Sequence, residues 1–179
     1  YGEIPVETIF IGGGTPSVPD SGLIVEIMEH VRHAFHVVDG AEISMEANPG
    51  TVTREKLTDY RKAGINRLSF GLQSANDREL KLLGRIHTWA EFLESFTLAR
   101  ECGFANLNID LMSALPGQTC ESWKETLSRV TDLDPEHISA YSLIIEEGTP
   151  FGERYGSEEG RKLLPDEDSE REMYHETKR

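Results

Sequence analysis

Five short apolar segments of the chain alternate with longer amphipathic segments, which is typical of repeated strand–helix units. We predict strands at residues 8–11, 42–46, 67–72, 107–112 and 137–143. In the first helical segment, which we expect to end at Asp39-Gly40, the apolar residues at helical spacing are Leu23, Ile27, Val31 and Phe35. Two neighbouring parallel strands need a crossover connection of a dozen or more residues, and this connection is usually a helix. Strands that alternate with helices therefore favour parallel pairing. The sequence therefore predicts an α/β fold with a parallel sheet.

Capping residues mark where the later helices should begin. Thr53, Asn76, Thr88 and Thr119 each stand directly before a helical segment. Thr88 is followed three residues later by Glu91, and this spacing fits a capping box. We therefore predict helices that start just after these four positions.

The acidic composition limits the partners that the chain can bind. Its 179 residues include 18 Lys and Arg against 32 Asp and Glu, which gives a net charge of −14. Such a chain repels a phosphate backbone, so we expect no nucleic-acid partner. No apolar run approaches the roughly 20 residues that span a bilayer, and the N-terminus lacks the order of a signal peptide. We expect a cytoplasmic protein without a transmembrane segment.

The chain changes character after residue 151. Residues 152–179 are acidic and contain few large apolar side chains, whereas residues 1–151 carry all five predicted strands. We predict a loop and then a solvated helix over 152–179, with the acidic run Asp166-Glu167-Asp168 as exposed surface.

Polar groups follow the predicted strands. Gly12-Gly13-Gly14-Thr15 follows the first strand, Glu46 ends the second, Gln73 follows the third, and Asp110 lies in the fourth. The carboxyl ends of parallel strands meet at one edge of a sheet, where ligands bind in such folds. Consecutive glycines let a ligand lie against the backbone. These residues predict a pocket edge with groups suited to hydroxyls and an ammonium group.

Several readings of these residues remain open. The glycines form neither Gly-x-Gly-x-x-Gly nor a Walker motif, which disfavours dinucleotide and phosphate sites. Glu46 and Asp110 are compatible with the acid–base pair of a glycosidase, or the polar residues simply cap helices. Arg85 follows a helix end and is suited to bind a carboxylate. Gln118 and Tyr141 are within reach of the same edge, although each has a structural explanation.

The histidines and cysteines do not predict a metal site. His30, His33 and His36 are spaced three residues apart, so successive histidines point in increasingly different directions around the predicted helix. A solvated face is therefore favoured over a metal centre. Cys102 and Cys120 are too far apart for a Cys-x-x-Cys motif and too few for a disulfide framework. We expect each to be a buried thiol on a helix.

Several motifs, taken in order, resemble radical S-adenosylmethionine (SAM) enzymes of the oxygen-independent coproporphyrinogen III oxidase type. They lie at residues 8–17, 46–49, 67–74, 84–87 and 108–111. Residues 46–49, 115–119 and 138–151 are similar to the HemW branch of that family, whose members are haem chaperones. Ala114 stands where relatives often have glycine, a change that is expected to narrow the turn before Pro116 without touching the ligand.

The resemblance implies a partial (β/α)₆ barrel that contains strands two to six, with residues 1–151 as its core. It implies SAM, a [4Fe–4S] cluster and haem as cofactors, and it assigns no catalytic side chain. The backbone of Gly13, Gly14 and Thr15 would meet the methionyl group of SAM. Glu46 and Arg85 would contact charged or hydroxyl groups of SAM, and Gln73 and Asp110 would contact its ribose.

The family holds its cluster through a Cys-x-x-x-Cys-x-x-Cys motif upstream of the glycine motif, and the sequence does not contain it. The chain therefore resembles an internal fragment that supplies no metal ligand and is expected to be inactive alone. The implied partners are haem or porphyrin, a haem-accepting protein and a second copy of the chain. Three functions stay open: a haem chaperone, an oxygen-independent coproporphyrinogen III dehydrogenase and a cofactor-free α/β binding module.

Overall fold

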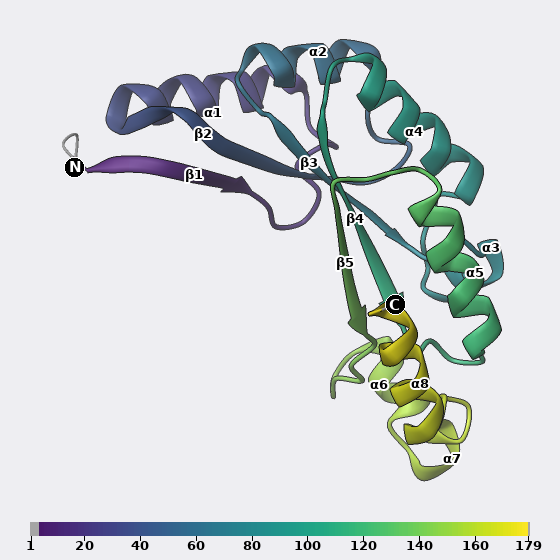
Figure 1. Ribbon diagram of the computed structural model, residues 1–179. Helices are drawn as coiled ribbons and strands as arrows, with labels where there is room; N and C mark the ends of the chain where they lie inside the picture. Colours follow the sequence, from purple (N-terminus) through teal and green to yellow (C-terminus); the bar gives the residue numbers. More distant parts are fainter. Residues whose placement is uncertain (1–3, 179) are drawn as a thin grey trace. The chain divides into compact units, whose positions relative to one another are not determined.

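The computed structural model describes residues 4–178, and its five strands form one sheet in chain order (Figure 1). The strands are β1 (Pro5–Ile11), β2 (His36–Ala47), β3 (Arg67–Gln73), β4 (Asn106–Ser113) and β5 (His137–Ser142). β1 pairs in parallel with β2, and β2 pairs in parallel with β3. All five predicted strands are present, and the predicted α/β class is confirmed.

Eight helices are described. They are α1 (Ser21–Ala34), α2 (Arg54–Lys62), α3 (Asp77–Leu82), α4 (Trp89–Glu101), α5 (Cys120–Thr131), α6 (Pro150–Tyr155), α7 (Glu158–Arg161) and α8 (Glu167–Thr177). The four predicted capping residues are the N-caps of α2, α3, α4 and α5, and each side chain accepts a backbone N–H of the first turn. The capping box of Thr88 and Glu91 is complete.

The described residues fall into two compact units. The first contains the chain up to residue 72 together with residues 87–109 and 135–137, and the second contains residues 73–86, 110–134 and those from 138 onward. In the first unit, α1, α2 and α4 cover one face of the sheet (Figure 1).

Side chains on the strands alternate between an apolar and a polar face. On β3, Leu68, Phe70 and Leu72 are fully buried, while Ser69 and Gln73 occupy the alternate positions. β2 and β4 follow the same rule. Strands of a parallel sheet that is covered on both faces are apolar throughout. The alternation therefore reserves one face for polar groups, and it is this face that carries the predicted site residues.

The apolar residues that the helical spacing singles out in α1 are not the ones that pack. Leu23 and Ile27 are 54% and 50% exposed, whereas Ile24 and Met28, one residue further along, are buried. Apolar residues cover two adjacent stripes of this helix, so spacing alone does not select the one that packs. The helix also ends at Ala34 rather than at Asp39-Gly40, because the extended strand β2 already begins at His36.

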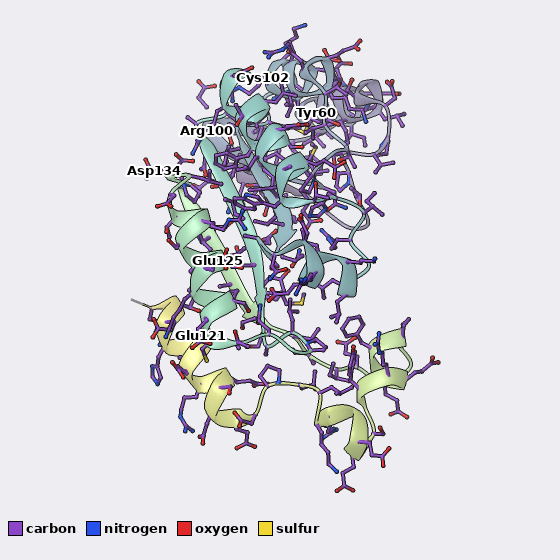
Figure 2. All side chains as sticks on the ribbon, turned by 90° about the vertical axis from the view of Figure 1, so that its right-hand side faces the viewer. Tyr60, Arg100, Cys102, Glu121, Glu125 and Asp134 are labelled. Carbon is purple, nitrogen blue, oxygen red and sulfur yellow. The ribbon has the colours of Figure 1, made fainter. Side chains whose placement is uncertain are left out.

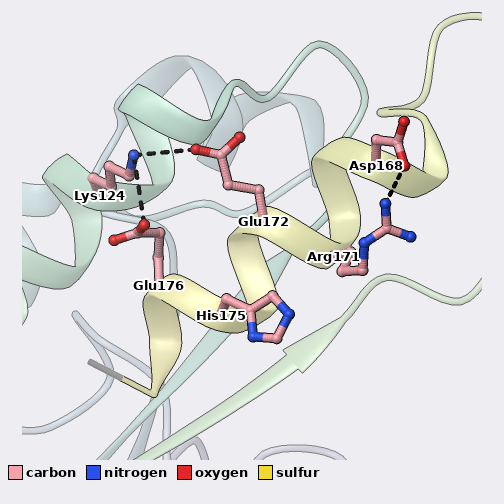
Figure 3. A pocket seen from close by; sticks show the side chains of 6 residues that line it. All are labelled: Lys124, Asp168, Arg171, Glu172, His175 and Glu176. Atoms are coloured by element: carbon pink, nitrogen blue, oxygen red, sulfur yellow. Dashed lines mark hydrogen bonds and ion pairs between the residues drawn. The ribbon is translucent and has the colours of Figure 1, made fainter.

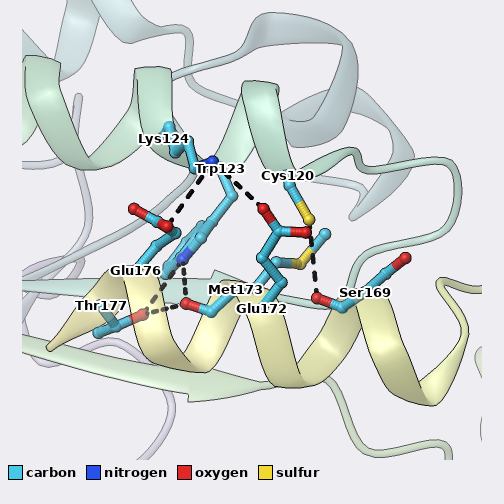
Figure 4. Close-up of polar contacts among 8 residues, drawn as sticks. All are labelled: Cys120, Trp123, Lys124, Ser169, Glu172, Met173, Glu176 and Thr177. Atoms are coloured by element: carbon cyan, nitrogen blue, oxygen red, sulfur yellow. Dashed lines mark hydrogen bonds and ion pairs between the residues drawn. The ribbon is translucent and has the colours of Figure 1, made fainter. Parts of the chain in front are cut away.

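The acidic C-terminal segment is packed against α5. Where a loop was expected, the chain forms the short helices α6 and α7. The predicted helix is present as α8, but it is not solvated all round, since Met173 is fully buried. Trp123 Nε1 donates to the Met173 carbonyl at 3.0 Å and to Thr177 Oγ1 at 3.1 Å (Figure 4). No helix within residues 4–178 is long and apolar enough to cross a membrane.

Candidate functional site

The glycine loop follows β1 in the first unit. Gly13 and Gly14 have φ angles of +89° and +61°, which favour glycine, and a Cβ at either would meet nothing within 4 Å. Gly12 is different, because a Cβ there would lie 2.5 Å from the Phe10 ring and 3.1 Å from the Glu46 carboxyl carbon. The loop is thus held close to β2 by Gly12, while the backbone of Gly13 and Gly14 stays open.

Glu46, at the end of β2, is joined to this loop. Its Oε2 accepts a hydrogen bond from the Gly13 backbone N–H at 3.1 Å, and the side chain is half-buried. Among residues 4–178, no donor is paired with its second oxygen, Oε1. One carboxylate oxygen therefore fixes the loop, and the other is available to a cation or hydroxyl.

A network of polar contacts fixes the rest of the glycine loop. Thr15 Oγ1 accepts from Asn48 Nδ2 at 3.1 Å, and Ser17 Oγ accepts from the Asn48 backbone N–H at 3.1 Å. The hydroxyls of Ser17 and Thr51 lie 2.6 Å apart. Lys56 Nζ donates to the Ser17 carbonyl at 2.8 Å. Sequence reasoning missed the roles of Asn48 and Lys56, since a lone lysine on a helix gives no signal of them.

Gln73 ends β3 and belongs to the second unit. It is 8% exposed, and its φ of +74° is unusual for a residue with a side chain. Its Oε1 accepts a hydrogen bond from the Tyr141 hydroxyl at 2.9 Å. Within residues 4–178, no acceptor is paired with its amide nitrogen Nε2. A largely buried amide therefore presents an unused donor.

Arg85 and Asp110 lie near Tyr141 in the same unit. Burial lowers the pKa of the Arg85 guanidinium, and the electrostatic influence of Tyr141 and Asp110 opposes that shift. Arginine stays charged nevertheless, because its ordinary pKa lies far above neutrality. We call Gln73, Arg85, Asp110 and Tyr141 the amide–guanidinium group. It combines an amide donor, a cation and a carboxylate.

A buried carboxylate connects the loops that follow β3 and β4. Glu79 on α3 is 8% exposed and accepts from Ser74 Oγ at 2.6 Å, Gln118 Nε2 at 2.9 Å and Ser122 Oγ at 2.9 Å. Gln118 Oε1 in turn accepts the Leu115 backbone N–H at 3.3 Å. Glu79 thereby joins the loop after β3 to the loop after β4. Sequence analysis did not single out Glu79.

The structure brings the predicted residues together in two sets. Gly13 contacts Glu46 directly in the first unit, and Thr15 lies in the same loop. In the second unit, Tyr141 donates a hydrogen bond to Gln73, and Arg85 lies within electrostatic range of both Tyr141 and Asp110. Tyr141 and Gln118, which the sequence left with structural explanations, donate hydrogen bonds to Gln73 and to Glu79, respectively.

The cysteines do not fit an iron–sulfur cluster. Cys102 is the C-cap of α4 and Cys120 is the first residue of α5, and both are free and half-exposed rather than buried as predicted. No group of three potential ligands occurs among residues 4–178. In the first unit, the open glycine backbone and the free Glu46 oxygen suit a ligand with an ammonium group, and in the second unit the Gln73 amide offers a donor.

A hollow of about 690 Å³ lies on the surface of α5 and α8 (Figure 3). It is lined by Lys124, Asp168, Arg171, Glu172, His175 and Glu176. Lys124 Nζ lies 3.3 Å from a Glu172 oxygen and 3.7 Å from a Glu176 oxygen, and Arg171 pairs with Asp168. Each of the two cations is already paired with carboxylates of the same hollow, so the hollow gives no reason to expect a ligand.

Comparison with known proteins identifies relatives. The radical SAM superfamily model matches residues 1–130. The heme chaperone HemW of Escherichia coli is 43% identical over 164 residues, which are 92% of this chain and 42% of that protein. HemW of Bacillus subtilis is 40% identical over 97% of the chain and 45% of its own length. The chain thus spans less than half the length of these relatives.

A solved structure extends the comparison to the fold. The coproporphyrinogen III oxidase HemN of Escherichia coli, described as a radical SAM enzyme, matches with a TM-score of 0.84 and 30% identity. The match covers 98% of this chain and 40% of that one. The prediction of a partial (β/α) barrel is thereby confirmed.

Proposed function

Because the chain belongs to the radical SAM superfamily, we propose that it is part of a haem chaperone that binds SAM, a [4Fe–4S] cluster and haem and passes haem to a haem protein. The names and similarity of the HemW relatives support this choice. The observation that carries it is the open glycine loop held by Glu46, since this is the arrangement that a small ligand with an ammonium group requires. The proposed location is the cytoplasm.

In the first unit, the glycine loop takes the methionyl group of SAM. The backbone of Gly13, Gly14 and Thr15 supplies N–H donors and carbonyl acceptors without a Cβ at the glycines. The free oxygen of Glu46 binds the ammonium group, because a carboxylate accepts charge-assisted hydrogen bonds from such a cation.

In the second unit, the amide–guanidinium group takes the other polar parts of the ligand. Asp110 accepts from ribose hydroxyls, and Gln73 donates to a hydroxyl oxygen. Arg85 binds the carboxylate of SAM, since its guanidinium has two parallel N–H donors.

In the superfamily, the cluster supplies an electron that cleaves SAM reductively. The residues of this chain bind and orient SAM, and no group of three potential metal ligands lies among residues 4–178. Their contribution is positional, because a bound ligand with fixed orientation reacts without a further loss of rotational freedom.

Calorimetric titration with SAM tests the proposal. We expect the wild-type chain to bind, and we expect Glu46→Ala and Asp110→Ala each to weaken binding at least about tenfold, as removal of a charge-assisted partner does. Glu55→Ala is the matched control, since Glu55 is an exposed acid on α2. Unchanged affinity in both site variants, or no binding by the wild type, would leave the cofactor-free binding module as the better description.

The second candidate is an oxygen-independent coproporphyrinogen III dehydrogenase, which the similarity to HemN favours. An anaerobic assay for protoporphyrinogen, with the cluster reconstituted in a complete protein that carries the cysteine motif, separates the two. Stable haem binding without turnover supports the chaperone, and oxidative decarboxylation supports the dehydrogenase.

A further inference from the structure

Tyr141 makes a specific contact with the side chain of Gln73. The two residues stand 68 positions apart in the sequence, on β5 and at the end of β3. The hydroxyl donates to Gln73 Oε1 at 2.9 Å. Tyr141 is 44% exposed, whereas Gln73 is 8% exposed, so the phenol reaches from the surface to a largely buried amide.

The neighbouring cation sets the direction of this hydrogen bond. A phenolic hydroxyl is able to donate or to accept, but a guanidinium has only donors. Arg85 lies within electrostatic range of Tyr141. Arg85 therefore cannot receive the phenolic proton, which is directed to the acceptor end of Gln73. The amide is left with Nε2 on its opposite side.

The backbone of Gln73 is fixed as well. Its φ of +74° lies in the left-handed region, and a residue with a side chain stays there only when its surroundings hold it. The next residue, Ser74, donates to the buried Glu79 carboxylate at 2.6 Å. Both the main chain and the amide plane of Gln73 are thus determined before a ligand arrives.

We propose that Tyr141 is a positioning residue that fixes the Gln73 amide so that Nε2 points to the ribose hydroxyls of SAM. The inference rests on the proposed function. Without the phenolic hydroxyl, the amide is free to turn over and to present oxygen where the ligand needs a donor. Because the net contribution of one hydrogen bond is modest, Tyr141→Phe should weaken SAM binding roughly three- to tenfold.

A double-mutant cycle with SAM tests this. The variants are Tyr141→Phe, Gln73→Ala and the double variant, each titrated by calorimetry with the full chain. If Tyr141 acts through Gln73, Tyr141→Phe weakens binding in the wild-type background and has no further effect beside Gln73→Ala. An equal loss in both backgrounds, or no loss in the wild-type background, overturns the inference. Equal melting temperatures of the variants exclude an effect of stability.

Two further measurements separate this inference from the function on which it rests. For a SAM analogue that lacks the ribose hydroxyls, the effect of Tyr141→Phe should disappear, and a persisting loss contradicts the proposed role. Without ligand, the side-chain amide resonances of Gln73 should shift in Tyr141→Phe. If the wild type fails to bind SAM, the proposed function falls, and unchanged amide resonances show that the positioning contact itself is absent.

Discussion

At the scale of single residues, the three consecutive glycines have different reasons to be glycine. Gly12 leaves room for Phe10 and Glu46, whereas Gly13 and Gly14 adopt left-handed backbone in open space. The sequence predicted that a ligand approaches this loop, but it did not distinguish packing from conformation. Whether a glycine is needed for packing depends partly on Glu46, which is 33 residues away from Gly13 along the chain.

Glu79→Gln should destabilise the chain. The carboxylate accepts hydrogen bonds from Ser74, Gln118 and Ser122, and an amide would turn one acceptor into a donor that faces other donors. A buried group left without its partner costs about 1–3 kcal/mol. We expect a loss of about 2 kcal/mol in the free energy of unfolding by urea.

The matched control is Glu125→Gln on the exposed face of α5 (Figure 2). Glu125 pairs only loosely with Arg129 at 3.8 Å, so its replacement should change the unfolding free energy by less than about 0.5 kcal/mol. Equal effects of the two variants would show that Glu79 does not hold the loops.

Tyr60→Phe should stabilise the chain. Tyr60, labelled in Figure 2, is fully buried, and within residues 4–178 its hydroxyl has no hydrogen-bond partner. Burial, together with the charges of Asp20 and Asp59, raises the pKa of this phenol. Removing an unpaired buried hydroxyl relieves its desolvation cost, so we expect a gain of up to about 1 kcal/mol in urea unfolding. Tyr174→Phe, at an exposed position, should be neutral, and a loss of stability in Tyr60→Phe would contradict the interpretation.

At the scale of elements, capping was predictable because it depends on three or four adjacent residues. Thr53, Asn76, Thr88 and Thr119 all cap the helices predicted for them. The buried face of α1 was not predictable, since Ile24 and Met28 compete with the Leu23 stripe and only the neighbouring elements decide between them. The packing of α8 was missed because a single buried residue, Met173, gives no periodic signal in an acidic segment.

Trp123→Phe should loosen α8. The indole Nε1 donates to the Met173 carbonyl and to Thr177 Oγ1, and phenylalanine keeps an aromatic but smaller ring and loses both contacts. We expect tryptic cleavage after Arg171 to become roughly three- to tenfold faster, because local opening becomes easier by about 1 kcal/mol. Trp89→Phe, which affects the stacking on Phe92 in the first unit, should leave cleavage in α8 unchanged. Equal rates in wild type and Trp123→Phe would contradict this role.

At the scale of the whole molecule, the sheet has β1 at one end of its strand order, and the first unit exposes several apolar side chains. Phe10 on β1 is 62% exposed, and Leu23 and Ile27 on α1 are 54% and 50% exposed. Edge strands and contiguous apolar surface promote association. We predict that the chain self-associates as its concentration rises, as light scattering will measure.

The double variant Leu23→Glu/Ile27→Lys keeps the net charge and should reduce this association strongly. Ile86→Lys is the control, since Ile86 is 88% exposed in the other unit. A wild-type chain that stays monomeric at high concentration would contradict the prediction. The strand order was predictable from chain order, but the exposure of α1 was not, for the reason given above.

The alternation along β3 has a consequence for how such a protein changes over evolutionary time. Leu68, Phe70 and Leu72 pack in the apolar core, whereas Ser69 and Gln73 lie at the alternate positions and accept hydrogen bonds from Asn108 and Tyr141. A single inserted residue in the strand would exchange the two sets at once. The polar positions are therefore free to change by substitution, whereas the length of the strand is not.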